Sequence, residues 1–257
     1  MNNVLYALRD CLVLSRRGSK HLIRRFDTLL TSAILPIVIL LLFTYLFGGA
    51  MSVALGGASY LNYVLPGILL MSVGYVATTI ASGVSDDMKK GLVSRLKSMP
   101  VARPAFIVGH IFASLIRNIV AIVCVIGLAL VLGYRSPASF WAWCGAMGMM
   151  LLFALAMTSI GVVLGLVASG PDSASAYSMP LMFLAYFTGA FVPLDTMPGA
   201  LRTFCTYQPI NIVLKAISGL LSNNNDYSVW ASLAWCLGIT VVCLIIGGVL
   251  FARKTVR

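Results

Sequence analysis

The chain has 257 residues, of which 60% are hydrophobic and only 10% are charged, whereas soluble domains carry roughly 25% charged residues. A mean hydropathy of +0.98 agrees, so an ordinary soluble domain is excluded and an integral membrane protein is predicted. The formal net charge is +11, but the basic residues cluster beside apolar segments, and three of them lie at the C-terminus. Charge that sets membrane topology explains this pattern better than nucleic-acid binding.

The N-terminal segment is basic and amphipathic. Apolar side chains from Val4 to Leu12 fall on one side of a helix over residues 3–17, which predicts a helix lying on the membrane surface. A poorly structured basic tail is the alternative. A retained first span is favoured over a cleaved signal peptide, because the apolar run is long and Gly48-Gly49-Ala50 is a poor cleavage site.

Six apolar segments are long enough to cross a bilayer, whose core of about 30 Å takes about 20 helical residues. They cover residues 28–47, 61–81, 106–132, 140–168, 174–192 and 229–251. We therefore predict an all-α membrane protein with one permease-like domain over residues 1–257. The even number of spans and the basic N-terminus place both termini on the cytoplasmic side. Between the last two spans, Pro209 separates two short stretches predicted as re-entrant outer helices.

The longest charged interruption covers residues 82–104, between the second and third spans. It predicts a cytoplasmic helix over residues 86–98, with Ser85 as the N-cap and Pro100 as the stop. One apolar stripe recurs every four residues: Val84, Met88, Leu92 and Leu96. Partner binding and adsorption to the inner leaflet are equally compatible with these residues alone.

Residues that carry catalysis or ion coupling are missing from the expected spans. There is no Walker A motif, no Asp lies in mid-membrane, and the six Cys and two His residues show no metal-ligand or disulfide pattern. Arg117 is the one ionisable candidate inside a span; it is either functional there or reaches the cytoplasmic interface beside Asn118. We expect a transport unit that is no enzyme, binds no metal or cofactor itself and is driven from elsewhere. A stand-alone secondary transporter or channel is the alternative.

Four segments, in this order, resemble the membrane subunit of type-2 ABC exporters, the group of drug-resistance, polysaccharide and lipid export permeases. They are ILPIVILLLFTYLFGGAM at the end of the first span, YVLPGILLMS in the second, GVSDDMKKGLVSRLKSMPVARPAFIVGHI in the charged interruption, and MPLMFLAYFTGAFVPLDTMPGALRTFCTYQPINIVLKAI after the fifth span begins. The resemblance extends over nearly the whole chain. Two departures are Asp86-Asp87, where many relatives carry Glu, and Arg117, where an acidic residue is common.

The resemblance implies that the cytoplasmic helix is a coupling helix, which docks on a separate ABC ATPase subunit that binds ATP and Mg. The implied contact residues are Asp86, Asp87, Met88, Lys89, Gly91, Leu92, Arg95 and Leu96. It also implies half a pore per chain, and so a dimer with a second copy or a sister permease in the cell membrane.

The resemblance further implies that the first, second and fifth spans line the path of an amphipathic or lipid-like cargo, such as a drug, lipid or glycan. The expected path residues are Tyr75, Tyr177, Phe183, Tyr186 and Phe187. Packed core or an interfacial aromatic belt is the alternative role for each of these rings.

Overall fold

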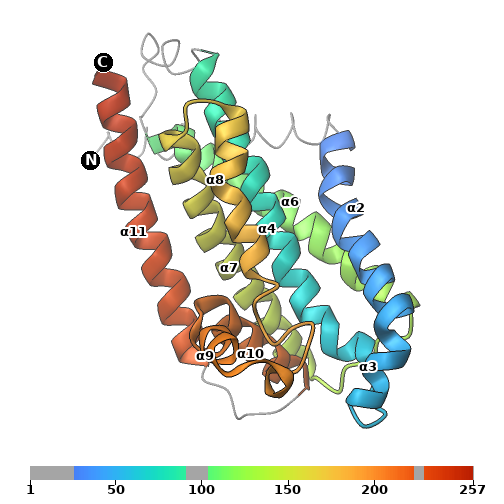
Figure 1. Cartoon of the computed structure of the whole chain (residues 1–257). Helices are drawn as coiled ribbons and strands as arrows, with labels where there is room; N and C mark the ends of the chain where they lie inside the picture. The colour runs from blue at the N-terminus through green and yellow to red at the C-terminus, as the bar shows by residue number, and fades with distance from the viewer. Residues whose placement is uncertain (1–25, 91–103, 223–228, 257) are drawn as a thin grey trace.

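The computed structural model describes residues 26–90, 104–222 and 229–256, and every regular element within these ranges is helical (Figure 1). This confirms the all-α prediction. The amphipathic helix expected over residues 3–17 lies outside the described residues. So do Gly91, Leu92, Arg95 and Leu96 of the expected coupling helix.

Five helical segments among the described residues are long and apolar enough to cross a membrane. The first is continuous through α2 (Phe26–Leu42), the π-helical turn η1 (Phe43–Phe47) and α3 (Gly48–Ala54). The others are α4 (Tyr60–Lys89), α6 (Pro104–Val131), α7 (Phe140–Val167) and α11 (Val229–Val256). These five lie over the first, second, third, fourth and sixth predicted segments.

The fifth predicted span, residues 174–192, is not a helix of membrane length. Helix α8 (Pro171–Leu184) ends after 14 residues, and the chain continues through turns to the short 3₁₀ helix η2 (Leu194–Thr196). Side chains of other elements bond the irregular backbone here: the Tyr60 hydroxyl donates to the Phe191 carbonyl at 3.0 Å, and the Tyr63 hydroxyl donates to the Gly189 carbonyl at 2.6 Å. Such partners allow irregular backbone amid apolar surroundings, and apolar composition alone does not reveal them.

Two predicted helix boundaries are also wrong. Gly48-Gly49 does not end the first helix. A glycine pair permits a helix to end but does not require it, and the chain turns instead at Gly56 and Gly57, whose φ angles are +66° and +90°. Ser85 is not an N-cap, because α4 continues unbroken past residue 81 to Lys89 and buries Ser85 inside the bundle. Residues 86–89 are therefore the last turn of α4 rather than the first turn of a new helix.

The two short helices predicted before the last span are present as α9 (Gly199–Tyr207) and α10 (Pro209–Ser222). Pro209 occupies the first position of α10, where its missing N–H would have no helical partner in any case. The predicted apolar face of α10 is buried, including Ile210, Val213 and Ile217. In Figure 1 both helices lie at the end of the molecule opposite the Lys89 end of α4.

Helix α4 lies at the centre of the structure, between α8 and α2 in Figure 1, and it also packs against α7. A Cβ atom added to Gly161 of α7 would lie 2.6 Å from the Ala77 carbonyl oxygen. A Cβ atom on Gly74 of α4 would lie 3.2 Å from the Leu181 carbonyl oxygen of α8. These glycines let backbones approach closely, which is the usual basis of helix association in an apolar environment.

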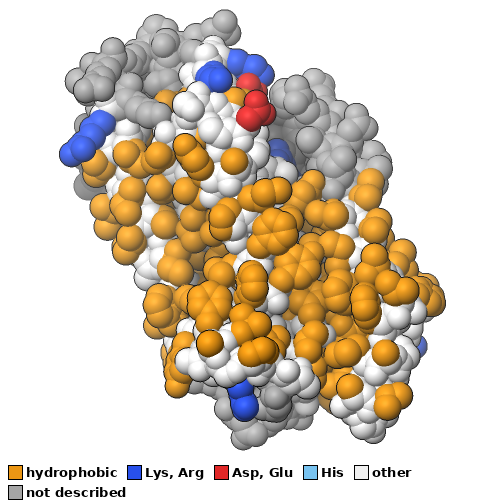
Figure 2. All heavy atoms as spheres, in the orientation of Figure 1, with side chains coloured by type: hydrophobic (Ala, Val, Ile, Leu, Met, Phe, Trp, Pro, Cys, Tyr) orange, Lys and Arg blue, Asp and Glu red, His pale blue; other side chains and the backbone are white. Residues whose placement is uncertain are grey.

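The surface carries the pattern expected of a membrane protein. Figure 2 shows a broad hydrophobic surface over most of this face, with acidic and basic side chains gathered near the end where α4 finishes. Exposed apolar residues occur on several long helices, among them Val38 on α2, Val123 on α6 and Val242 on α11. Apolar surface of this extent requires a covering of lipid or of another chain.

Gly161→Leu should destabilise the fold, because the new side chain would meet the backbone of α4 rather than a movable side chain. Overpacking of this kind costs about 1–3 kcal/mol, which should lower the thermal unfolding midpoint of the purified protein in detergent. Gly148→Leu is the matched control, since Gly148 is on the same helix with no atom within 4 Å of its added Cβ. Equal midpoints for the two variants would show that the α4–α7 contact is not tight.

Candidate functional site

The charged end of α4 holds the described part of the expected ATPase contact. Asp86 and Asp87 are partly buried, whereas Lys89 is exposed. The Asp86 carboxylate pairs with Lys90 at 2.5 Å, and the Asp87 carboxylate lies 3.1 Å from His110 Nε2 on α6. The last turn of α4 is thus held against α6 by a polar contact, and Lys89 remains exposed beside it.

The apolar stripe of the expected coupling helix begins inside the molecule. Val84 is fully buried, and Met88 packs against the same hydrophobic cluster, which also contains Phe251 of α11. Of this stripe, Val84 and Met88 therefore contact the hydrophobic core of this chain itself. Any contact of Leu92 and Leu96 with an ATPase subunit stays a prediction.

The predicted path residues fall into two groups. Tyr75 is partly buried on α4, and Tyr177 is exposed at the middle of α8. Phe183, Tyr186 and Phe187 lie together around the end of α8, where the rings of Phe183 and Tyr186 have centroids 6.1 Å apart. Among the described residues, no ring contact joins Tyr75 or Tyr177 to this group.

The aromatic group at the end of α8 extends to the first membrane-length helix. Tyr186 stacks on Phe191 with centroids 5.1 Å apart, and Phe191 contacts Phe43 of η1 at 4.9 Å. Sequence reasoning missed Phe43 and Phe191 because each is one apolar residue among many. Their contact depends on the turn after α8, which composition does not predict.

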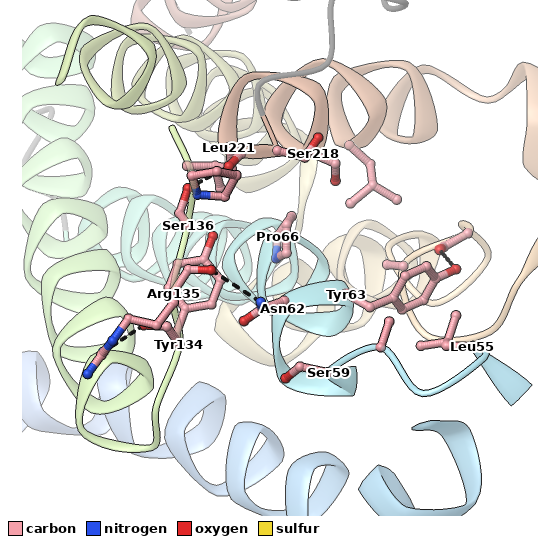
Figure 3. Close-up of a pocket in the computed structure, with 16 residues that line it drawn as sticks. Leu55, Ser59, Asn62, Tyr63, Pro66, Tyr134, Arg135, Ser136, Ser218 and Leu221 are labelled. Atoms are coloured by element: carbon pink, nitrogen blue, oxygen red, sulfur yellow. Dashed lines mark hydrogen bonds between the residues drawn. The ribbon is translucent and has the colours of Figure 1, made fainter. Parts of the chain in front are cut away.

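A pocket of about 410 Å³ opens at the α9/α10 end of the molecule (Figure 3). We call it the Tyr63 pocket. Its walls come from the start of α4, the loop between α6 and α7, the turn after α8, and α10. Its polar lining includes Ser59, Asn62, Tyr63, Ser136 and Ser218.

Hydrogen bonds between these four elements hold the pocket open. Asn62 Nδ2 donates to the Arg135 carbonyl at 3.2 Å, and the Ser136 hydroxyl donates to the Leu221 carbonyl of α10 at 2.5 Å. The Arg135 guanidinium donates to the Tyr134 carbonyl at 2.9 Å, and in Figure 3 it extends away from Asn62 and Ser218. Burial raises the pKa of the Tyr134 phenol above its ordinary value, with the hydrogen bond to Ser136 opposing this, so the phenol remains neutral.

The lining of the Tyr63 pocket suits a neutral ligand with an apolar body. Its polar groups are hydroxyls, the Asn62 amide and backbone carbonyls, and no carboxylate is among the lining residues. Arg135 is the one charged lining residue, and its guanidinium extends away from Asn62 and Ser218 (Figure 3). Asn62 and Asn211 are the residues by which the sequence could have indicated this site, and they were missed. Asn211 in particular is a buried amide on the apolar face of α10, and its Oδ1 accepts from the Gly189 N–H at 3.2 Å.

A second polar group lies where α4, α6 and α7 meet. The Ser114 and Thr158 hydroxyls are 2.6 Å apart, and Asn118 Nδ2 donates to the Ser114 carbonyl at 3.0 Å. Arg117 points toward α4, where its guanidinium donates to Thr79 Oγ1 at 3.4 Å. Within the described ranges, no three His, Cys, Asp or Glu side chains gather as a metal site requires.

Comparison with known proteins decides the family. Residues 9–222 match the family described as ABC-2 type transporter. The chain belongs to this family. It is 30% identical over 231 residues to "Daunorubicin resistance ABC transporter permease protein DrrB1" of Streptomyces coeruleorubidus, covering 89% of this chain and 78% of the relative. It is 23% identical over 228 residues to "Probable doxorubicin resistance ABC transporter permease protein DrrC" of Mycobacterium tuberculosis, covering 86% and 80%.

Family membership confirms the resemblance read from the four sequence segments. The protein is a multi-pass membrane permease subunit of an ABC transporter, and its residues 1–257 contain no Walker A motif. Permeases of this kind act together with an ATPase subunit. This partner therefore supplies the energy for transport, for which the chain itself shows no nucleotide-binding motif.

Asn211→Leu should weaken the α9/α10 end, because the partly buried Gly189 N–H loses its acceptor while the side-chain volume is kept. An unsatisfied buried donor costs about 1–3 kcal/mol, so the thermal unfolding midpoint of the purified permease should fall. Thr203→Val is the control, since this exposed hydroxyl bonds only to Gly199 of its own helix. A midpoint unchanged by Asn211→Leu would mean that this contact does not hold α10 in place.

Proposed function

We propose that this permease exports amphipathic, drug-like molecules across the cell membrane, using ATP hydrolysed by its partner. The observation that carries the proposal is similarity along most of the chain to two permeases named for daunorubicin and doxorubicin resistance. The broad aromatic and apolar surface of α8 is compatible with such cargo. ATP and Mg would bind on the ATPase subunit.

The proposed topology puts the Lys89 end of α4 in the cytoplasm, together with both termini. Basic residues support it: Lys89, Lys90 and Arg253 lie at the ends of α4 and α11, and both ends are on the same side in Figure 1. Helices α9 and α10 and the Tyr63 pocket then face outward, with α9 and α10 as short outer helices that do not cross the membrane.

We assign energy coupling to the segment that continues from α4, through Asp86, Asp87 and Lys89 into residues 91–98. Helix α4 supports this role mechanically. It is a single 30-residue helix, and its glycine contacts fix it to α7 and α8. Motion of its charged end would therefore reach the centre of the bundle without passing through a flexible loop.

The path itself is proposed to form between two permeases, either two copies or a copy and a sister chain. Tyr177, Phe183 and Phe187 are exposed on or just after α8, and Tyr45 and Leu46 are exposed on η1. Two such surfaces facing each other would enclose an aromatic route, with Tyr75 and Tyr186 at its edges. Membrane lipid would cover the remaining apolar surface.

A direct test uses inverted membrane vesicles containing the permease and its partner ATPase subunit. ATP-dependent uptake is measured for a panel of fluorescent amphiphiles that includes doxorubicin and neutral and anionic dyes. Uptake of at least one of them should require ATP and both subunits. Uptake without the ATPase subunit would instead support a stand-alone transporter, and absence of uptake across the panel would contradict drug export.

The coupling proposal predicts the effect of Leu92→Asp combined with Leu96→Asp. Two charges on the proposed docking stripe should abolish co-purification of the ATPase subunit, because charged groups are excluded from the centre of such contacts. The amount of permease in the membrane should be unchanged. Leu201→Asp, on α9 at the opposite end, is the control. Undiminished co-purification of the double variant would rule out docking through this stripe.

A further inference from the structure

One face of α4 is polar within the membrane-length part of the helix. Its residues recur at spacings of four, three and four, which places them on one line along the helix: Tyr75, Thr79, Ser82 and Asp86. Each of the four is partly exposed, whereas Val76, Ile80 and Ala81 beside them are buried. We call this line the α4 polar stripe. Partly exposed polar side chains therefore extend from the charged end of α4 to its middle, along a helix that is otherwise largely buried.

Arg117 of α6 faces this stripe. Its guanidinium donates to Thr79 Oγ1 at 3.4 Å. The exposed apolar residues of α6, which include Val108, Phe112 and Ile119, lie on the opposite side of that helix. Arg117 is therefore directed into the bundle and does not lie on the exposed apolar side of α6.

No counter-charge accompanies Arg117 in the part of the chain that the structure describes. The ion pairs found there are Lys90 with Asp86 and His110 with Asp87. Asp86, the carboxylate on the stripe itself, is seven residues from Thr79, which is about 10 Å along the helix, and it is paired with Lys90. Arg117 Nε is also buried without a hydrogen-bond partner. A cation placed among apolar helices without an anion is costly, and such groups generally mark a functional site.

We propose that Arg117 is a specificity-determining residue that binds the oxyanion of an amphiphile whose polar end occupies the α4 polar stripe. The guanidinium offers several N–H donors in a planar fork that matches carboxylate, sulfate or phosphate oxygens. Ser82 adds a hydroxyl and Tyr75 adds a phenol on the same line. The Thr79 hydroxyl, by contrast, donates to the Val76 carbonyl at 2.7 Å and accepts from Arg117. A cationic amphiphile meets a like charge at the same point. The permease accordingly prefers anionic to cationic amphiphiles, so its preferred cargo differs in charge from doxorubicin, whose amine is protonated at neutral pH.

This inference rests on the proposed export function and names the cargo class for it. The oxyanion has two possible sources with the same chemistry, a transported amphiphile and a phospholipid headgroup. Both reach Arg117 from the leaflet at the charged end of α4, because the polar stripe begins there with Asp86. Binding measurements separate the two sources and do not depend on transport.

The test uses the purified permease–ATPase complex in phosphatidylcholine nanodiscs and three pyrene probes of equal chain length. The probes are pyrenebutanoate, pyrenebutanol and pyrenebutyltrimethylammonium, and binding is read as energy transfer from Trp, corrected for partition into empty nanodiscs. The native complex should bind the anion about tenfold more tightly than the cation, with the alcohol between them. Arg117→Gln should reduce this preference to about twofold or less, and Arg117→Glu should reverse it.

Two further variants separate charge recognition from misfolding. Arg117→Lys should keep most of the preference, because the charge remains. Thr79→Asp should abolish the preference with Arg117 still present, because the new carboxylate would pair with the guanidinium. Arg253→Gln, which removes an exposed charge at the end of α11, is the control and should change nothing. A native complex without charge preference, or a preference that survives both Arg117→Gln and Thr79→Asp, would overturn the proposal.

The lipid source is tested by adding phosphatidylglycerol to the nanodiscs. If headgroups enter the site, the apparent Kd for pyrenebutanoate should rise in the native complex and stay constant in Arg117→Gln. If only the transported amphiphile enters, the Kd should be unchanged in both. Charge-selective binding without ATP-dependent uptake would contradict the export function alone. Uptake that is indifferent to Arg117 would contradict this inference alone.

Discussion

Close packing of α7 and α8 against the backbone of α4 is the constraint on which the structure depends. Gly161 and Gly74 have no side chain at the points where carbonyls of Ala77 and Leu181 approach. In an apolar environment there is little hydrophobic gain from joining two helices, so such close contact supplies much of the attraction. It fixes a 30-residue helix that extends from the Tyr63 pocket at one end to the charged Asp86–Lys90 end at the other.

The α9/α10 end illustrates how irregular backbone is accommodated beside that helix. After α8 ends at Leu184, the turn at Gly189–Phe191 receives hydrogen bonds from Tyr60 and Tyr63 of α4, and Asn211 of α10 accepts from it. These bonds replace those that a longer α8 would have made within itself. They also assemble the walls of the Tyr63 pocket, so the early end of α8 and the pocket have the same physical origin.

The charges of this permease are placed unevenly. Lys89 and Lys90 are exposed at the end of α4, where solvent and lipid headgroups stabilise them, whereas Arg117 is directed into the bundle. Among the described residues, the one hydrogen-bond partner of Arg117 is a hydroxyl. A hydroxyl compensates the charge of a buried cation less well than the anionic partner that a structural arginine would have. The same incomplete compensation is what a binding site for a transient anion requires, since a permanent internal carboxylate would compete with the ligand.

The sequence by itself determined the class of protein, the position of five membrane-length helices, the two short helices around Pro209 and the family. These follow from apolar length, proline positions and motif order, which are local properties. Only the tertiary structure decided that α8 ends at Leu184, that α4 continues through Ser85, and that Arg117 faces Thr79. Each of these depends on hydrogen bonds or packing between residues far apart in the chain, which no local pattern records.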